Sequence, residues 1–239
     1  MNNTARDSLA IIPTYNEAAN LEVLVAQVLR HEQFDILVVD DNSPDGTGRL
    51  ADTLAERFPG RVTVVHRPRK QGLGAALVGG FTHALSGRHD YIFQMDADLS
   101  HDPASLPEMR RALENADVVV GSRYAAGGRT VHWPAWRRSL SRLGSRYAAS
   151  VLRLPFRDLT SGYKGFRRKV LETLVLGEIR SSGYAFQIEV TYRSHRTGFR
   201  VVELPITFVD RARGKSKMSW RIVREALLVV PRLRWATPH

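Results

Sequence analysis

The fold is decided by the stretch Tyr91-Ile-Phe-Gln-Met-Asp96-Ala-Asp98, in which an apolar run ends abruptly in two carboxylates. A buried strand over this run would deliver Asp96 and Asp98 at its carboxyl end, where open α/β sheets bind their ligands. Two carboxylates on one short loop repel each other unless a cation or a donor group lies between them, and such oxygens suit a hard divalent ion that also contacts phosphates. If this stretch stood alone, a solvated Asp-x-Asp turn would be the simpler interpretation. The other segments of the chain decide between such a turn and a binding site.

Two earlier segments show the same succession of an apolar run and a polar cluster. Residues 9–13 lead into Thr14-Tyr-Asn-Glu17, and residues 34–39 lead into Asp40-Asp-Asn-Ser-Pro-Asp-Gly-Thr47. Apolar residues at helical spacing follow each cluster, namely Leu21, Leu24, Val25, Val28 and Leu29 after the first and Leu50, Leu54 and Phe58 after the second. This alternation predicts an α/β fold with βαβ units and a parallel sheet. We therefore expect three polar loops to meet at one edge of that sheet.

Size and composition favour one large α/β domain over residues 1–239. The chain has 239 residues, of which 43% are hydrophobic, enough to bury a sizeable core. It contains no cysteine, which excludes disulfides, thiolate nucleophiles and cysteine metal sites. The polar start lacks the apolar stretch of a secretory signal, and no run approaches the roughly 18 apolar residues of a spanning helix. We expect a protein that is soluble or lies on a surface.

Charge is divided unevenly between the two halves of the chain. Residues 1–128 carry 12 Lys or Arg and 17 Asp or Glu, a net charge of −5, whereas residues 129–239 carry 23 and 7, a net charge of +16. The acidic half suits a metal-nucleotide site, and the basic half suits an anionic partner. The alternatives for the basic half are nucleic acid, an anionic membrane surface and a solvated surface without a partner.

Two segments of the basic half mix arginine with aromatic and apolar residues. In residues 133–153 large apolar residues recur three and four positions apart, with arginines largely between them. Residues 220–235 repeat the mixture between Trp220 and Trp235. Helices of this kind lie in a membrane interface, with arginine stems reaching the headgroups. The pattern favours a membrane surface; packing on the domain core, or an oligomer interface for the second segment, is the alternative.

Glycine marks a further helix start at Gln71-Gly-Leu-Gly74-Ala-Ala76. Small residues there allow close approach of a ligand or of neighbouring backbone. A dinucleotide fingerprint would read G-x-G-x-x-G directly after a strand, but position 77 is Leu and a basic loop intervenes. The sequence also has no Walker lysine motif. We therefore exclude a Rossmann dehydrogenase and a P-loop NTPase.

Several motifs occur together along the chain: Thr14-Tyr-Asn-Glu17, Val38-Val-Asp-Asp-Asn-Ser-Pro-Asp-Gly-Thr47, Gly72-Leu-Gly74, Asp96-Ala-Asp-Leu-Ser-His101, Gly121-Ser-Arg-Tyr124, Asp158-Leu-Thr-Ser-Gly-Tyr-Lys-Gly-Phe166, Gly183-Tyr-Ala-Phe-Gln-Ile-Glu189 and Arg211-x-Arg-Gly-Lys-Ser-Lys-Met218. In this combination the chain resembles family 2 glycosyltransferases of the GT-A fold, and more narrowly the dolichyl- or polyprenyl-phosphate mannose synthases. The resemblance implies a Rossmann-like, mostly parallel central sheet flanked by helices, with amphipathic interfacial helices in the C-terminal half. It also implies a nucleotide- and metal-binding half, residues 1–128, and an acceptor- and membrane-facing half, residues 129–239.

The resemblance implies roles for individual residues. The nucleotide would be bound by Pro13, Tyr15, Glu17, Val39, Asp41 and Asp96. Mg²⁺ or Mn²⁺ would be held by Asp96, Asp98 and Ser100, where several family members have Gln in place of the serine. The acceptor and its phosphate would be bound by Arg123, Arg137, Ser161, Gln187, Arg211, Arg213, Lys215 and Lys217. Catalysis would rest on Asp98, Arg123, Arg211 and Lys217, with residues 211–217 forming a mobile loop that closes on both substrates and excludes water.

The implied reaction is one inverting displacement. Mannose would pass from GDP-mannose to a polyprenyl (dolichyl) monophosphate in a metal-dependent step, giving a β-mannosyl phosphoryl polyprenol. The enzyme would be peripheral, at the cytoplasmic face of the cell membrane on an anionic surface, without nucleic acid; a separate membrane-anchoring protein is a candidate partner. The alternative donor is UDP-glucose, which would give polyprenyl-phosphate glucose. A nucleic-acid-binding module is a further alternative that the three acidic loops disfavour.

Overall fold

The computed structural model describes residues 6–179, 181–210 and 228–235. The strands are β1 (Ser8–Thr14), β2 (Phe34–Asp40), β3 (Val62–His66), β4 (Tyr91–Gln94), β5 (Val118–Ser122), β6 (Arg129–Val131), β7 (Lys164–Arg167), β8 (Val201–Pro205) and β9 (Thr207–Val209). The helices are α1 (Ala18–Leu29), α2 (Thr47–Arg57), α3 (Leu73–Leu85), η1 (Pro103–Ser105), α4 (Leu106–Ala112), α5 (Ala135–Leu152), α6 (Arg168–Thr173), η2 (Leu176–Glu178) and α7 (Gly183–Arg196).

A central sheet of seven strands has the order β3-β2-β1-β4-β7-β5-β8. Strands β1 to β4 pair in parallel, as do β5 and β8, so the prediction of a mostly parallel sheet is confirmed. Strand β7 is the exception, because it runs antiparallel between β4 and β5. Its Gly165 is required there, since a Cβ at this position would lie 2.5 Å from the ring of Phe93. A short second sheet pairs β6 with β9.

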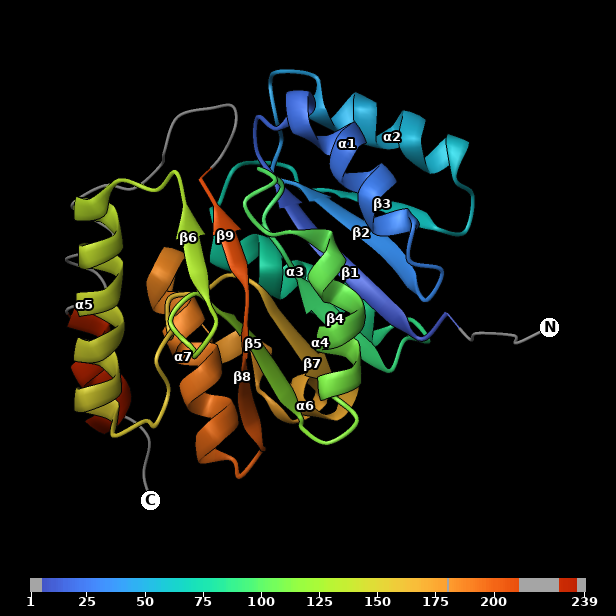
Figure 1. Cartoon of the computed structure of the whole chain (residues 1–239). Coiled ribbons are helices and arrows are strands. Elements are labelled where there is room, and N and C mark those ends of the chain that lie inside the picture. The colour runs from blue at the N-terminus through green and yellow to red at the C-terminus, as the bar shows by residue number, and fades with distance from the viewer. Residues whose placement is uncertain (1–5, 180, 211–227, 236–239) are drawn as a thin grey trace.

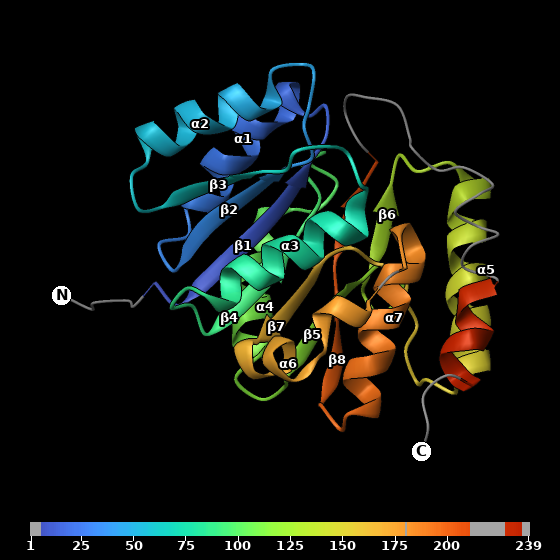
Figure 2. The ribbon, with the colours of Figure 1, turned by 180° about the vertical axis from the view of Figure 1, so that it is seen from behind.

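Helices cover both faces of the central sheet. Figures 1 and 2, which view the molecule from opposite sides, show α1, α2 and α4 over one face and α3 and α6 over the other. One buried cluster joins the sheet to the first group through residues such as Leu24 and Met109. A second cluster joins it to α3, α6 and α7 through residues such as Phe81 and Phe186. Strands buried on both faces explain the continuous apolar runs of β1 and β2.

Helix α5 lies beside the sheet, and the described part of the tail, residues 228–235, is a helix next to it (Figures 1 and 2). Ala148 and Leu152 of α5 pack with Val230 of the tail and with Ile188 of α7. The opposite side of α5 is open, because Trp136 is 62% exposed and Leu143 is 60% exposed. The predicted helix in residues 133–153 is therefore confirmed, and it both packs on the core and displays apolar side chains. Within the described residues, no helix has the length and apolarity needed to cross a bilayer.

Two adjacent glycines of α3 give a matched test of packing against the sheet. A Cβ on Gly80 would lie 2.7 Å from Ile11 Cγ2 in β1, whereas a Cβ on Gly79 would meet nothing within 4 Å. We expect Gly80→Ala to lower the free energy of unfolding by about 1–3 kcal/mol, as overpacking does. Gly79→Ala should leave it unchanged or raise it by up to about 1 kcal/mol through better helix propensity. Urea unfolding measures both changes, and equal effects would contradict the close contact.

Candidate active site at the carboxyl ends of β1, β2 and β4

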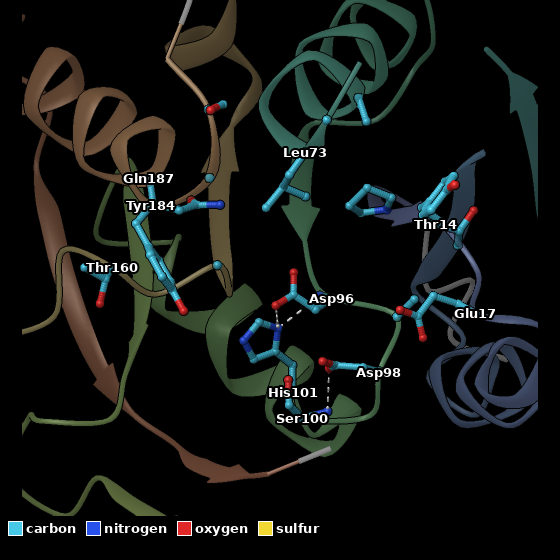
Figure 3. Close-up of a pocket in the computed structure, with 18 of the residues that line it drawn as sticks. Thr14, Glu17, Leu73, Asp96, Asp98, Ser100, His101, Thr160, Tyr184 and Gln187 are labelled. Carbon is cyan, nitrogen blue, oxygen red and sulfur yellow. Dashed lines mark hydrogen bonds and ion pairs between the residues drawn. The ribbon is translucent and has the colours of Figure 1, made fainter. Parts of the chain in front are cut away.

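The three polar loops predicted from the sequence meet at one edge of the sheet. A cavity of about 450 Å³ opens there, lined by residues from both halves of the chain. The predicted site residues that line it are Pro13, Tyr15, Glu17, Asp41, Asp96, Asp98, Ser100, Arg123, Arg137 and Gln187. Figure 3 shows Thr14 and Glu17 on one side of Asp96, and Gln187 and Tyr184 on the other. Asp96 and Asp98 therefore lie between these two groups of lining residues.

Two predicted residues lie outside the lining, and four lie outside the described residues. Val39 is fully buried in the core cluster on the α3 face of the sheet. Ser161 is also buried, and its hydroxyl donates to the backbone carbonyl of Gly121 at 2.6 Å. Neither residue lines the cavity, because Val39 of β2 packs into the core and Ser161, just before β7, turns its hydroxyl to the backbone of β5. Arg211, Arg213, Lys215 and Lys217 belong to the undescribed segment 211–227.

Asp41 follows β2 and is held by several donors. Its carboxylate accepts from Arg67 Nη1 at 2.6 Å, from the backbone N–H of Gln71 and from the backbone N–H of Gly72 at 2.9 Å. The loop before α3 is thereby tied to the end of β2. The neighbouring Asp40 turns away instead and accepts from Thr14 Oγ1 and Ser43 Oγ. Only one residue of the Asp-Asp pair therefore faces the cavity.

The loop after β4 places two carboxylates and a hydroxyl together. Leu99 adopts a left-handed conformation, with φ of +63°, and the backbone N–H of Ser100 donates to Asp98 Oδ1 at 3.1 Å. The buried Ser100 Oγ has no hydrogen-bond partner among the described residues. Carboxylate and hydroxyl oxygens are ligands suited to Mg²⁺ or Mn²⁺. This donor set fits a divalent ion that takes its other ligands from a diphosphate and water.

His101 fixes the position of Asp96. The ring is buried and stacks on Tyr163 at a centroid distance of 4.9 Å, and its Nδ1 accepts from the backbone N–H of Asp96 at 3.0 Å. Burial lowers the pKa of His101, an effect that the nearby carboxylates of Asp96 and Asp98 only partly oppose. The ring is therefore neutral at pH 7 and carries its proton on Nε2. Asp96 Oδ2, 4.0 Å from Nδ1, is not bound by that ring nitrogen.

Arg123 is buried at the cavity wall beside Asp158. The guanidinium donates to both carboxylate oxygens at 2.7 Å and to Thr160 Oγ1 at 2.8 Å. Burial alone would lower the pKa of Arg123, but the charge of Asp158 raises it. Burial alone would likewise raise the pKa of Asp158, but Arg123 holds it below its usual range. Arg123, which was predicted to bind the acceptor phosphate, therefore lies at the cavity wall in an ion pair with Asp158.

Several lining residues were not predicted as site residues. Lys70 places its ammonium 3.6 Å from the ring centre of Tyr15. Trp133 and Phe208 lie against Arg123, with the guanidinium carbon 5.2 and 5.4 Å from their ring centres. Asp210 also lines the cavity and pairs with the predicted residue Arg137 at 3.8 Å. The basic composition of residues 67–70 could have indicated Lys70 as a site residue. No local sequence pattern indicates Phe208, which reaches the cavity through the small β6-β9 sheet.

The sequence profile described as Glycosyl transferase family 2 matches residues 9–175, which include all three loops. The chain belongs to this family. It is therefore a glycosyltransferase, as the motifs predicted, and similar proteins include undecaprenyl-, polyprenol- and dolichol-phosphate mannosyltransferases. An undecaprenyl-phosphate mannosyltransferase of Micrococcus luteus is 47% identical over 94% of this chain and 92% of its own. A polyprenol monophosphomannose synthase of Mycolicibacterium smegmatis is 48% identical over 93% of this chain and 85% of its own.

Solved structures agree with the GT-A fold of this glycosyltransferase. The glucosyl-3-phosphoglycerate synthase of Mycobacterium tuberculosis, solved with Mn²⁺, UDP and glucosyl-3-phosphoglycerate, superposes with a TM-score of 0.70 over 98% of this chain and 81% of its own. A mannosyltransferase of Pyrobaculum calidifontis, solved with GDP-Man and Mn²⁺, gives a TM-score of 0.66 over 98% of this chain and 65% of its own. Both are 19% identical to this chain, so these likenesses show the fold alone.

Proposed function

We propose that the enzyme transfers mannose from GDP-mannose to a polyprenyl monophosphate and gives a β-mannosyl phosphoryl polyprenol. The observation that carries this proposal is the 47–48% identity, over nearly the whole chain, to relatives named for polyprenol or undecaprenyl phosphate and mannose. A structure of the same fold that holds GDP-Man supports the choice of donor. In this proposal the donor and the acceptor meet in the cavity beside the paired aspartates, which line it.

The lining suggests how the substrates lie. Tyr15 and Glu17 with Asp41 form the end of the cavity nearest the nucleotide-binding half, where a guanosine would fit. The diphosphate would then lie beside Asp96 and Asp98. Arg137, at the other end, offers a guanidinium that can match an acceptor phosphate. The mannosyl group would therefore lie between the aspartates and the basic wall.

A divalent cation fits the middle of the cavity in this arrangement. Asp96 and Asp98 would hold it with their carboxylates, and Ser100 with the buried hydroxyl that has no protein partner among the described residues. Within those same residues, no three His, Cys, Asp or Glu side chains gather closely enough to form a metal site by themselves. When bound, such an ion stabilises the negative charge that develops on a departing diphosphate. The solved neighbours that contain Mn²⁺ favour this ion type without deciding between Mg²⁺ and Mn²⁺.

The acceptor removes the need for a strong general base. A phosphate monoester is ionised at neutral pH, so its oxygen attacks the anomeric carbon of mannose without losing a proton, whereas a sugar hydroxyl would need proton removal. The protein must hold the two anionic substrates in line, and direct attack inverts the anomeric configuration. In this proposal Asp96 and Asp98, together with Arg137, would orient the two ends of this displacement.

The donor assignment is tested by supplying purified protein and a polyprenyl monophosphate with each of two labelled sugar nucleotides. GDP-mannose should give labelled, lipid-extractable product, and UDP-glucose should give much less. Glucosyl transfer as the only activity would overturn the mannose assignment. Proton NMR of the product should show the β-mannosyl linkage, because one displacement on an α-linked donor inverts the centre.

We also propose that the exposed face of α5 meets the cytoplasmic surface of an anionic membrane, with or without a membrane-anchoring protein. Trp136 and Leu143 are exposed on a helix that also carries Arg138, Arg142 and Arg146. We expect co-sedimentation with anionic vesicles that weakens as salt rises, because each Lys or Arg near such a surface contributes about 1 kcal/mol.

Trp136→Ser should weaken vesicle binding by about tenfold, since one large apolar side chain no longer enters the interface. The matched control is Val23→Ser, which removes an exposed apolar residue from α1 on the other side of the molecule. Equal vesicle binding by the wild type, Trp136→Ser and Val23→Ser would contradict a role for α5.

A further inference from the structure

A buried pair of amides connects the sheet to the cavity wall. Gln94 at the end of β4 places its Nε2 2.9 Å from the backbone carbonyl of Gly162 and 2.7 Å from Gln187 Oε1. Lys164 of β7, which is fully buried, donates from Nζ to the backbone carbonyl of Gln187 at 2.7 Å and to Gln187 Oε1 at 2.9 Å. The side-chain oxygen of Gln187 is therefore held by two donors.

The backbone fixes which way both amides face. The carbonyl of Gly162 can only accept, so the Gln94 atom beside it must be the nitrogen. The same nitrogen contacts Gln187, so the Gln187 atom facing it must be the oxygen. Lys164 adds a second donor to that oxygen. Burial lowers the pKa of Lys164 to about 7, and a neutral amine still has the two N–H groups that both contacts need.

In this arrangement the side-chain N–H of Gln187 is a hydrogen-bond donor without a partner in the described part of the chain. Gln187 Nε2 is buried and has no hydrogen-bond partner among the described residues. Gln187 as a whole is 2% exposed, yet it lines the cavity, and Figure 3 shows its side chain directed from α7 toward the space beside Asp96. Gln94 Oε1 is also buried without a partner among the described residues, but Gln94 does not line the cavity. A buried donor without a partner costs stability, so the unpaired N–H of Gln187, which does line the cavity, points to a ligand.

We propose that Gln187 Nε2 donates a hydrogen bond to a substrate oxygen on the sugar side of the paired aspartates, and that Gln94 and Lys164 are positioning residues that orient this amide. The inference rests on the proposed function, which places the transferred mannose and the acceptor phosphate at this end of the cavity. Sugar hydroxyls and phosphate oxygens are both acceptors that an amide N–H can bind. The experiments below distinguish a mannose hydroxyl from an acceptor phosphate oxygen as the group that Gln187 binds.

Gln187→Glu is the decisive variant. A glutamate has the same shape and can accept from Gln94 and Lys164, but it presents an oxygen to the cavity in place of the N–H. We expect the melting temperature to be kept and kcat/KM for lipid mannosylation to fall about 10- to 100-fold, the range for a lost hydrogen bond to a polar or charged group. Gln187→Met, which also lacks the donor, serves as the second variant should the glutamate disturb folding.

Calorimetry and kinetics distinguish the two sources. If the amide binds mannose, Gln187→Glu loses affinity for GDP-mannose while its affinity for GDP is unchanged. If the amide binds the acceptor phosphate, affinity for GDP-mannose is unchanged and KM for the polyprenyl phosphate rises. The control is Gln27→Glu, the same change on α1 away from the cavity, which should alter neither quantity.

The positioning role predicts non-additive kinetics. Lys164→Met should lower kcat/KM several-fold in the wild type, because the Gln187 amide is then held by one donor only. The same change in a Gln187→Met background should have no further kinetic effect, since the amide on which Lys164 acts is gone. A purely structural Lys164 would give the same loss in both backgrounds.

The proposal is overturned if folded Gln187→Glu and Gln187→Met keep wild-type affinity for GDP-mannose and wild-type KM for the acceptor. Failure of the proposed function gives a different result, because the wild type itself would then transfer no mannose to lipid. The two failures are therefore distinguishable in one set of assays.

Discussion

Replacing Asp98 by asparagine is expected to abolish lipid mannosylation while leaving the protein folded. Asp98 is 6% exposed and lines the cavity, where the diphosphate and its cation are proposed to lie. Asparagine keeps an oxygen to accept from the backbone N–H of Ser100, so the loop after β4 should hold its shape. It removes the negative charge, and we expect a loss in kcat of about 10²–10³-fold or more, as for other electrostatic contacts to a reacting centre.

Asp102→Asn is the matched control for this variant. Asp102 belongs to the same loop, but its exposed side chain accepts from the backbone N–H of Ala104 and caps η1. Asparagine caps helices as well as aspartate does, so activity and stability should change little. Unchanged turnover by Asp98→Asn, or an equal loss in Asp102→Asn, would contradict the role given to Asp98.

Replacing Asp158 by alanine is expected to cause the largest loss of stability. The change leaves the buried guanidinium of Arg123 without its carboxylate, and a broken buried ion pair costs about 3–5 kcal/mol. For a chain of this size the melting temperature should fall by roughly 2–4 °C for each kcal/mol. Chemical unfolding and thermal melting measure both quantities.

Two further variants isolate the cause of that loss. The double variant Arg123→Met with Asp158→Leu should recover part of the stability, because no unpaired charge stays buried. Glu22→Ala breaks an exposed pair with Arg57 and should cost at most about 1 kcal/mol. If Asp158→Ala lowered the free energy of unfolding by no more than Glu22→Ala does, the strong coupling of the buried pair would be contradicted.

The pH dependence follows from the same pair. The pKa of Asp158 lies below its usual range in the folded protein. Its stabilising contribution is therefore present above the unfolded-state pKa of about 3.9 and is lost as the pH falls through the folded-state pKa. The difference in stability between the wild type and Asp158→Asn should accordingly narrow under acid conditions.

Much of the sheet could be predicted because local pattern and burial agree there. The runs that end at Thr14, Asp40 and Asp96 are mostly apolar, as strands covered on both faces require, although Gln94 interrupts the last of them. Strand β7 escaped prediction because Lys164-Gly-Phe-Arg167 has no apolar run and owes its place to neighbours distant in sequence. Its buried lysine is accommodated by Gln187, a contact that spans 23 residues.

The candidate site was predictable where motif residues themselves face the cavity. Adjacent residues were harder, since sequence alone does not say that Asp41 faces the cavity while Asp40 turns to Thr14. Arg123 lines the cavity, but its partner Asp158 is 35 residues away, and only the folded chain brings the two together. The functional roles of these residues stay predictions that the variants above address.

The most direct test is a measurement of lipid mannosylation by the wild-type enzyme after treatment with a chelator, followed by stepwise return of Mg²⁺ or Mn²⁺. The proposed chemistry predicts that product formation from GDP-mannose and polyprenyl phosphate stops without a divalent ion and recovers as one is restored, while Asp98→Asn recovers little. Full-rate transfer by chelator-treated protein would contradict it.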